Sequence, residues 1–166
     1  LKLDFLESQN GSVKDKKAYD FNTEVGSYSG EIKDGNMHGQ GKMKYANGEY
    51  FEGSFLDNER SGEGRMFWPN GDFYDGEWEN DNIEGSGKMT YSNGDIYIGD
   101  WIENEKWLKG KMNYTNGDVY EGDWLCDKRS GPQGKMTYDN GDFCEGWWSD
   151  DKIRSKHYYV KKTFNL

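Results

Sequence analysis

The feature that most constrains this chain is a repeat with a period of 23 residues. The residues Tyr28, Phe51, Tyr74, Tyr97 and Tyr120 follow one another at intervals of 23, and the next step, to Cys144, is 24 because one residue is inserted at Pro132 or a neighbour. A period of 20 to 50 residues is typical of arrays in which each unit packs against the next. The sequence therefore predicts a repeat array from about Gly26 to Asp151.

Each repeat contains two stretches in which side chains alternate between two faces. In Tyr97-Ile98-Gly99-Asp100-Trp101, the tyrosine, glycine and tryptophan share one face, and Gly87, Met89 and Tyr91 share a face in the preceding stretch. A period of two indicates β-strands, not helices. Two such stretches joined by Asn-Gly predict a β-hairpin.

Parity decides the type of the turn that contains Asn93-Gly94. A two-residue loop would pair Met89 with Ile98 and put the methionine on the wrong face. A three-residue loop, Ser92 to Gly94, pairs Met89 with Tyr97 and collects the large side chains on one face. We therefore expect a type I turn followed by a glycine bulge, with positive φ at the glycine only.

Stacking of the hairpins would place four columns of large side chains on one face, which we call the aromatic face. The tyrosine column is Tyr28, Phe51, Tyr74, Tyr97, Tyr120 and Cys144, and the tryptophan column is Ile32, Phe55, Trp78, Trp101, Trp124 and Trp148. The methionine column is Met43, Met66, Met89, Met112 and Met136, and the outer column is Tyr45, Trp68, Tyr91, Tyr114 and Tyr138. Glycines between the first two columns imply close packing over the backbone. Eleven or twelve strands at ~4.8 Å spacing would form a ribbon about 50 Å long.

Composition and charge narrow the class of partner. The net charge is −10, and residues 26–150 carry 12 basic and 25 acidic side chains. Such an acidic body disfavours nucleic acid and anionic lipid as partners. Two cysteines, Cys126 and Cys144, do not make a disulfide framework and indicate reduced thiols. Neither a signal peptide nor an apolar run of membrane-spanning length is predicted.

The repeat resembles the MORN-repeat family. Tyr74-Asp75-Gly76-Glu77-Trp78 matches that family's Tyr-x-Gly-x-Trp pattern, and His38-Gly39-Gln40-Gly41 matches its His-Gly-x-Gly pattern. The chain departs from the pattern at Ile32, at Cys144 and at Trp107-Leu108. The resemblance implies an all-β fold, an elongated single-layer antiparallel sheet of tandem hairpins. It also implies a module for protein interaction and assembly in the cytoplasm, with relatives at membranes, the cytoskeleton and cilia.

We expect three segments along the chain. Residues 1–25 form an N-terminal cap, in which Lys17 to Phe21 is a candidate strand and Ser12 to Tyr19 a candidate helix. Residues 26–151 form the array, with five full repeats and the first half of a sixth. Residues 152–166 form a basic C-terminal capping strand and tail, in which His157 to Lys161 is the last strand and Tyr159 continues the methionine column.

The predicted function is that of a non-catalytic scaffold that binds a partner peptide or helix along an aromatic groove. Exposed aromatic and methionine side chains favour protein contacts. The candidate partner-binding residues are Tyr74, Trp78, Tyr97, Trp101, Tyr120 and Trp124, with Met89 and Met112 as the floor. The opposite face carries Asp75, Glu77, Asp100, Glu121 and Asp123, which would favour a basic partner.

No catalytic, metal-binding or cofactor-binding residues are predicted. His38 is interpreted as bracing its loop and His157 as structural, and separate hairpins seldom bring a cysteine and a histidine within hydrogen-bond reach. The acidic groups Glu79, Asp81 and Glu84 are interpreted as solvated charge, because they lack the spacing of a calcium loop.

Three alternatives stay open from the sequence. The basic residues Arg154, Lys156, Lys161 and Lys162 could tether the chain to a membrane or to the cytoskeleton. The chain could instead be the repeat portion of a larger enzyme. A homodimer formed along a sheet edge is also compatible with the pattern.

Overall fold

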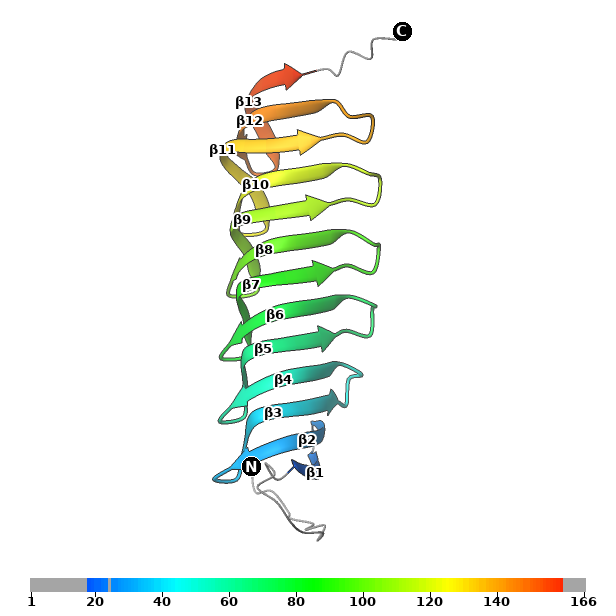
Figure 1. The fold of residues 1–166 in the computed structure, drawn as a ribbon, viewed down its shortest axis with the longest axis vertical. Helices are drawn as coiled ribbons and strands as arrows, with labels where there is room; N and C mark the ends of the chain where they lie inside the picture. Colours follow the sequence, from blue (N-terminus) through cyan, green and yellow to red (C-terminus); the bar gives the residue numbers. More distant parts are fainter. Residues whose placement is uncertain (1–17, 24, 160–166) are drawn as a thin grey trace. The chain divides into compact units, whose positions relative to one another are not determined.

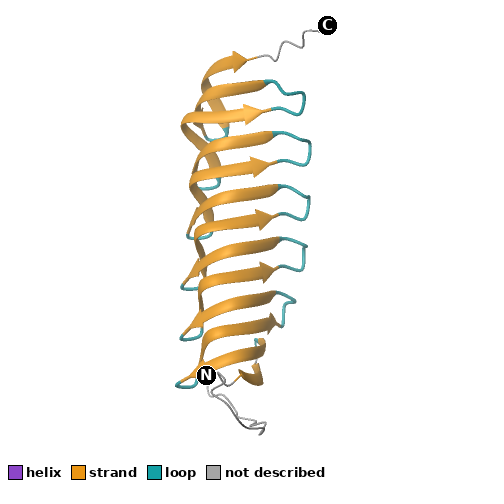
Figure 2. Cartoon of the chain, viewed as in Figure 1, coloured by secondary structure: helices purple, strands orange, loops and turns teal. Residues whose placement is uncertain are grey.

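The computed structural model describes residues 18–23 and 25–159, and every regular element in them is a β-strand. Figure 2 shows strands and turns alone in this part of the chain. The chain divides into two compact units, residues 1–82 and 83–166, and each is described by itself. Within each unit, neighbouring strands along the chain lie side by side and antiparallel (Figure 1). The expected all-β fold, a single-layer antiparallel sheet of tandem hairpins, is confirmed within each unit.

The first unit contains six strands among its described residues. They are β1 (Ala18–Thr23), β2 (Gly26–Lys33), β3 (Asn36–Tyr45), β4 (Tyr50–Leu56), β5 (Glu59–Phe67) and β6 (Phe73–Glu79). Strand β1 pairs with β2, so the predicted capping strand exists, displaced to Ala18–Thr23. The alternative helix over Ser12 to Tyr19 is wrong at residues 18 and 19, and its remainder lies outside the described residues.

The second unit begins one residue into β7 and contains seven strands in its residues up to 159, where the described part ends. They are β7 (Asn82–Thr90), β8 (Ile96–Ile102), β9 (Glu105–Asn113), β10 (Val119–Leu125), β11 (Lys128–Thr137), β12 (Phe143–Ser149) and β13 (Lys152–Tyr159). The inserted residue lies in β11, where the pairing with β12 shifts between Gly131 and Gly134. This confirms the predicted insertion at Pro132 or a neighbour.

The Asn-Gly turns have the predicted geometry. Tyr91 N donates to Asp95 O at 2.9 Å and Gly94 N donates to Tyr91 O at 2.8 Å, which closes a three-residue loop. Met89 consequently pairs with Tyr97. Gly94 has a φ of 91°, whereas the φ of Asn93 is not positive. The type I turn with a glycine bulge is therefore confirmed, and Gly48, Gly71, Gly117 and Gly141 repeat it.

The turns at the opposite ends of the strands have a different geometry. Both residues of Asp57-Asn58 have positive φ, as do both residues of Glu103-Asn104 and Cys126-Asp127. Two-residue loops with positive φ at both positions are mirror-image turns, whose twist matches that of the flanking strands. The second strand of each hairpin then carries a bulge: Ser54 of β4 lies opposite Ser61 to Glu63 of β5, between the pairs Gly53–Gly64 and Phe55–Arg60.

The last hairpin corrects one predicted register. In β12 and β13, Cys144 pairs with Tyr158 and Phe143 with Tyr159, so Tyr158, not Tyr159, continues the methionine column. The cause is a shorter bulge, because Trp147 pairs with Ser155 and Trp148 with Ile153, which leaves a single extra residue in β13. The strand begins at Lys152, earlier than predicted, and residues 160–166, with Lys161 and Lys162, lie outside the described residues.

Candidate functional site

Each tyrosine of the tyrosine column lies over glycines of its own hairpin. The Tyr97 hydroxyl donates to the carbonyl of Asp100 at 3.1 Å. A Cβ atom on Gly99 would approach that hydroxyl to 2.5 Å, and one on Gly110 would meet the same ring. The equivalent hydroxyls of Tyr28, Tyr74 and Tyr120 also donate to the carbonyl three residues ahead. The recurrent glycines therefore provide space for the rings.

Tryptophans of the next column pack edge-on against these tyrosines. The Tyr97 ring lies 5.1 Å from Trp101 and 5.2 Å from Trp124, at interplanar angles of 86° and 83°. Edge-to-face pairs at such distances are favourable. The Trp124 indole also donates to Gly110 O, as Trp78 does to Gly64 O and Trp148 to Gly134 O. Each indole is thus tied to the preceding hairpin of its unit.

This packing changes the predicted binding groove. All of Tyr74, Trp78, Met89, Tyr97, Trp101, Met112, Tyr120 and Trp124 lie on the aromatic face, but they are only 0% to 8% exposed. The expectation of an open groove was wrong in this respect, because the rings cover one another without a second layer. The residues of the outer column, such as Tyr91 and Tyr114, are half-buried. Contact between the eight buried residues and a partner stays a prediction, and their burial disfavours it.

A ladder of side-chain caps, which the sequence reasoning missed, joins successive hairpins at the mirror-image turns. Asp81 N donates to Arg60 O at 3.1 Å, and Arg60 N donates to the Asp81 carboxylate at 2.9 Å. The same exchange joins Met37 to Asn58, Ile83 to Asn104, Lys106 to Asp127 and Arg129 to Asp151. Asp81 is therefore structural as well as half-exposed, and its interpretation as solvated charge alone was incomplete. Glu84 likewise accepts from Glu103 N.

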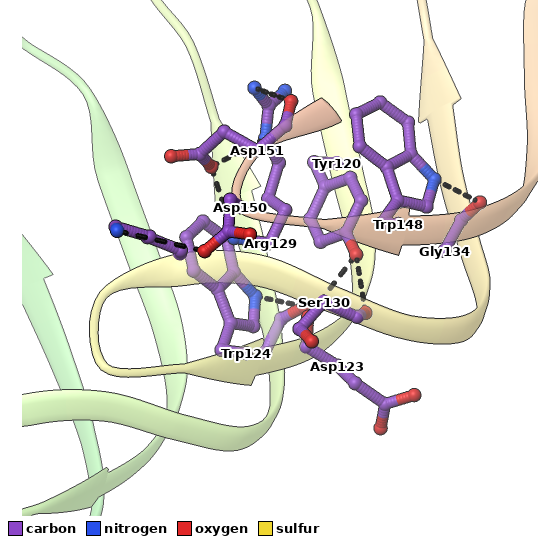
Figure 3. A network of polar contacts seen from close by, with 11 residues as sticks. Tyr120, Asp123, Trp124, Arg129, Ser130, Gly134, Trp148, Asp150 and Asp151 are labelled. Carbon is purple, nitrogen blue, oxygen red and sulfur yellow. Dashed lines mark hydrogen bonds and ion pairs between the residues drawn. The ribbon is translucent and has the colours of Figure 1, made fainter. Parts of the chain in front are cut away.

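Each of these reciprocal pairs, which we call a rung, has a chemistry that depends on the first residue of the pair. Arginine or lysine is capped by aspartate and forms an ion pair with it, whereas Met37 and Ile83 are capped by asparagine. The basic side chains also cover the aromatic face: the Arg60 guanidinium lies 4.3 Å from the Trp78 ring centre, and that of Arg129 lies 4.8 Å from Trp148. Figure 3 shows Arg129 between Trp148 and Asp151. Cation–π contact and ion pairing thus act on the same group.

Replacing the Arg60–Asp81 pair by a Met–Asn pair should preserve stability only when both residues are changed together. We expect Arg60→Met and Asp81→Asn each to lower the free energy of unfolding by about 1–2 kcal/mol, because each leaves a partly buried charge with less compensation. The double variant reproduces the Met37–Asn58 rung and should recover most of the loss. Urea unfolding of the four proteins measures the coupling.

The pair Arg65 and Asp75 is the matched control for that cycle. Its atoms Nε and Oδ2 are also in contact, at 3.2 Å, but both side chains are largely exposed. Surface pairs contribute little, so Arg65→Met with Asp75→Asn should show a coupling below about 0.5 kcal/mol. Equal coupling energies in the two cycles would contradict the structural role of the rung.

Burial shifts the ionisation of several groups on the aromatic face. Desolvation, followed by the negative charge of Glu31, raises the pKa of Tyr28 to about 12. Desolvation raises the pKa of Tyr74, Tyr97 and Tyr120 still further. Burial by itself lowers the pKa of Lys106, but hydrogen bonds to the Tyr91 hydroxyl and the Asp127 carboxylate outweigh it and raise that pKa. The face therefore holds neutral phenols beside charged basic groups.

The opposite face of each unit, which we call the back face, is less covered. Its acidic residues are partly neutralised, because Asp75 pairs with Arg65, Glu121 with Lys111 and Asp123 with Lys109. Tyr50, Phe67 and Phe73 form an aromatic row on it in the first unit. Five large apolar residues of the back face are 42% to 53% exposed: Leu56, Phe67, Ile98, Leu125 and Trp147. The sequence reasoning did not single out these residues, although each neighbours a residue of the aromatic face in the chain.

Groups that could support chemistry are scattered over the described residues. Cys126 is exposed in a turn, and Cys144 is buried in the tyrosine column. His38 Nδ1 is buried, lies 3.6 Å from the Asp57 carboxylate and has no hydrogen-bond partner among the described residues, so the expected hydrogen bond that braces the loop is not formed by this atom. No group of three or more potential metal ligands occurs in the part of the chain that the structure describes. Within the same residues, no helix is long and apolar enough to cross a membrane.

Together, the fold and the two faces define a tandem β-hairpin repeat protein. The family model for the MORN repeat matches residues 28–50, 51–73, 74–96, 97–119 and 120–143. These consecutive matches cover more than half of the chain, which belongs to the MORN-repeat family.

Two further comparisons add little to this assignment. No curated protein matches the chain. Among solved structures, it is similar to the SAS-4 (dCPAP) TCP domain of Drosophila melanogaster, a structure in complex with a proline-rich motif of Ana2 (dSTIL). The identity is 13%, the TM-score is 0.48, and the match covers 96% of this chain and 99% of that chain.

Proposed function

We propose that this chain is a non-catalytic scaffold that binds another protein. The observation that carries the proposal is the exposure of large apolar side chains on a back face that has no covering layer within the described residues of either unit. Leu125 and Trp147, for example, are 47% and 53% exposed. Soluble proteins seldom expose such side chains in groups unless they form an interaction surface.

The absence of a catalytic role is part of the proposal. A nucleophile needs a base within hydrogen-bond reach. Cys144 is buried, with its thiol 3.5 Å from the Tyr138 hydroxyl, and it has no histidine among its described contacts. The exposed Cys126 has a raised pKa, from desolvation first and the nearby Glu105 second, which disfavours the reactive thiolate.

The proposal has two forms that differ in which face binds. In the form expected from the sequence, a peptide or helix lies along the aromatic groove. The 3% and 4% exposure of Trp101 and Trp124 means that rings would have to move before a ligand could touch them. We favour the back face, because its apolar side chains are accessible without rearrangement.

Photo-crosslinking from defined positions tests both forms. We would place p-benzoylphenylalanine at Leu125 on the back face and, in a second protein, at Tyr114 on the aromatic face, and irradiate each in cells. We expect discrete protein adducts, and adducts from Leu125 would identify the back face as the binding surface. Adducts from Tyr114 alone would support the groove. Absence of any protein adduct from both positions would contradict the scaffold function.

A further inference from the structure

The repeats are numbered in chain order, so that repeat 4 is residues 97–119. Repeat 4 departs from the other repeats at one pair of positions. Where the others have His38-Gly39, Ser61-Gly62, Glu84-Gly85 and Ser130-Gly131, repeat 4 has Trp107-Leu108. Both residues lie in β9: Trp107 pairs with Asp100, and Leu108 lies in the bulge between that pair and the pair Gly99–Gly110. A small or polar pair is thus replaced by two large apolar residues.

The backbone at this position is unfavourable for leucine. Leu108 has a φ of 52°, in the left-handed region, whereas Gly39, Gly62, Gly85 and Gly131 have φ between 65° and 94° at the same position. A bulky residue in this region is strained, which glycine avoids. Burial does not compensate, because Leu108 is 56% exposed. Strain that packing does not explain is a reason to look for a function.

The neighbours of this pair make it part of a patch. Lys106 reaches over the Trp101 and Trp124 rings of the aromatic face, so the next residue, Trp107, lies on the back face. Ile102 and Leu125 follow Trp101 and Trp124 and lie on the same back face. Leu125 lies beside Trp107, because Trp124 of β10 pairs with Leu108 in antiparallel register. Ile102 is two residues from Asp100, the partner of Trp107. The positive φ of Leu108 turns its side chain to the same face, since a Cβ atom at the equivalent Gly131 would meet the back-face residue Asp123. We call Ile102, Trp107, Leu108 and Leu125 the repeat-4 patch.

No other repeat has four large apolar residues at these positions. Repeat 2 has Leu56, Ser61, Gly62 and Glu79, and repeat 5 has Leu125, Ser130, Gly131 and Ser149. The patch is therefore a local property of repeat 4 and not a consequence of the repeat pattern. A residue needed only for the hairpin would follow the pattern.

The charge around the patch indicates the chemistry of its partner. Residues 100–127 carry seven acidic and three basic side chains. Lys106 points to the aromatic face, and Lys109 and Lys111 are paired with Asp123 and Glu121. Glu103 lies in the turn next to Ile102, and Glu105, the first residue of β9, pairs with Ile102. An apolar surface with an acidic surround fits a ligand that has apolar anchors and positive charge.

We infer that the repeat-4 patch is the docking site for a short protein segment in which large apolar residues alternate with or adjoin lysine or arginine. The inference rests on the proposed scaffold function and specifies its surface and its partner class. The apolar anchors contact Trp107, Leu108 and Leu125, and the basic residues approach Glu103 and Glu105.

The test uses the whole chain as bait for a phage-displayed library of random dodecapeptides. The patch variant carries Trp107→Ser and Leu108→Gly, which restores the Ser-Gly pair of repeats 2 and 5. Because this removes backbone strain, it should retain the circular dichroism spectrum and melting temperature of the wild type. The matched control is Leu56→Glu, which replaces an exposed back-face leucine at the position equivalent to Leu125, outside the patch.

Peptides enriched by the wild type should combine large apolar residues with lysine or arginine. The expected loss of affinity for a synthetic copy is at least tenfold in the patch variant and less than twofold in Leu56→Glu. Affinity should also fall as salt is raised. Enriched peptides that are acidic, or that bind the patch variant unchanged, would overturn the inference while leaving the scaffold function intact. No enriched peptide at all, with no adduct from the crosslinking positions, would overturn both.

Discussion

Substituting Gly110 by alanine should destabilise the chain, and removing the Tyr97 ring should abolish the effect. A Cβ atom at Gly110 meets only atoms of the Tyr97 ring among its three nearest neighbours. Overpacking of this kind costs about 3 kcal/mol when the ring has no space into which it can move. In a Tyr97→Leu background the colliding atoms are absent, so Gly110→Ala should cost less than about 0.5 kcal/mol. Urea unfolding of the four proteins gives the coupling energy.

Gly99 is the control for this double-mutant cycle, because its collision does not depend on the Tyr97 ring alone. A Cβ atom there would lie 2.5 Å from the carbonyl oxygen of Lys109 and 2.6 Å from the Cα atom of Gly110, so the collision involves backbone as well as the Tyr97 hydroxyl. Gly99→Ala should therefore stay costly in the Tyr97→Leu background, because the two backbone contacts remain. If the Tyr97→Leu change did not rescue Gly110→Ala, Gly110 would not serve to make room for the ring as described above.

The strands and the Asn-Gly turns could be predicted from the sequence, because they depend on which side chains alternate onto the same face. The requirement that Met89 and Tyr97 share a face determined the loop length, and the structure has that pairing. The mirror-image turns could not be read in the same way. Glu103-Asn104 and Cys126-Asp127 contain no glycine, and their positive φ values result from strand twist and from the caps that their second residues provide.

The sequence predicted that the large side chains of the candidate site share one face, but it did not predict their burial. A sheet with one layer was expected to leave its rings partly open, yet Tyr97 is 0% exposed. The covering groups include Lys106, which crosses the aromatic face from the neighbouring strand. A signal for this was present in the sequence: Arg60, Lys106 and Arg129 are followed 21 or 22 residues later by aspartate, whereas Met37 and Ile83 are followed by asparagine. Such a pairing at long range becomes visible only when the strands are placed side by side.

Raising the pH should unfold the chain over a narrow range above about pH 10, through the tyrosine column. Tyrosine in the unfolded chain loses its proton near pH 10, whereas burial raises the pKa of Tyr28 to about 12 and those of Tyr74, Tyr97 and Tyr120 further. Below pH 10 both states keep the proton and stability does not change. Above it the unfolded state releases protons that the folded state retains, so stability falls as the pH rises.

The magnitude is large because four phenols contribute together. Each contributes a slope of about 1.4 kcal/mol per pH unit, so four give roughly 5 kcal/mol per unit between about pH 10 and pH 12. That is comparable to the whole stability of an ordinary domain. Circular dichroism and tyrosinate absorbance, followed through the titration, should show unfolding and phenol ionisation in one transition. Phenols that ionise while the spectrum of the sheet is unchanged would contradict the burial of the column.

Phenylalanine variants show whether these particular tyrosines produce the slope. Phe51 already occupies the column without a hydroxyl and is fully buried, so the site accepts the change. Tyr97→Phe with Tyr120→Phe should cost about 1 kcal/mol for each lost hydrogen bond at neutral pH. The same variant should lose about half of the tyrosine column's contribution to the alkaline slope, because two of the column's four shifted phenols are gone. It would therefore be less stable than the wild type at pH 7 and more stable at about pH 11, and this crossing cannot arise from a general loss of packing.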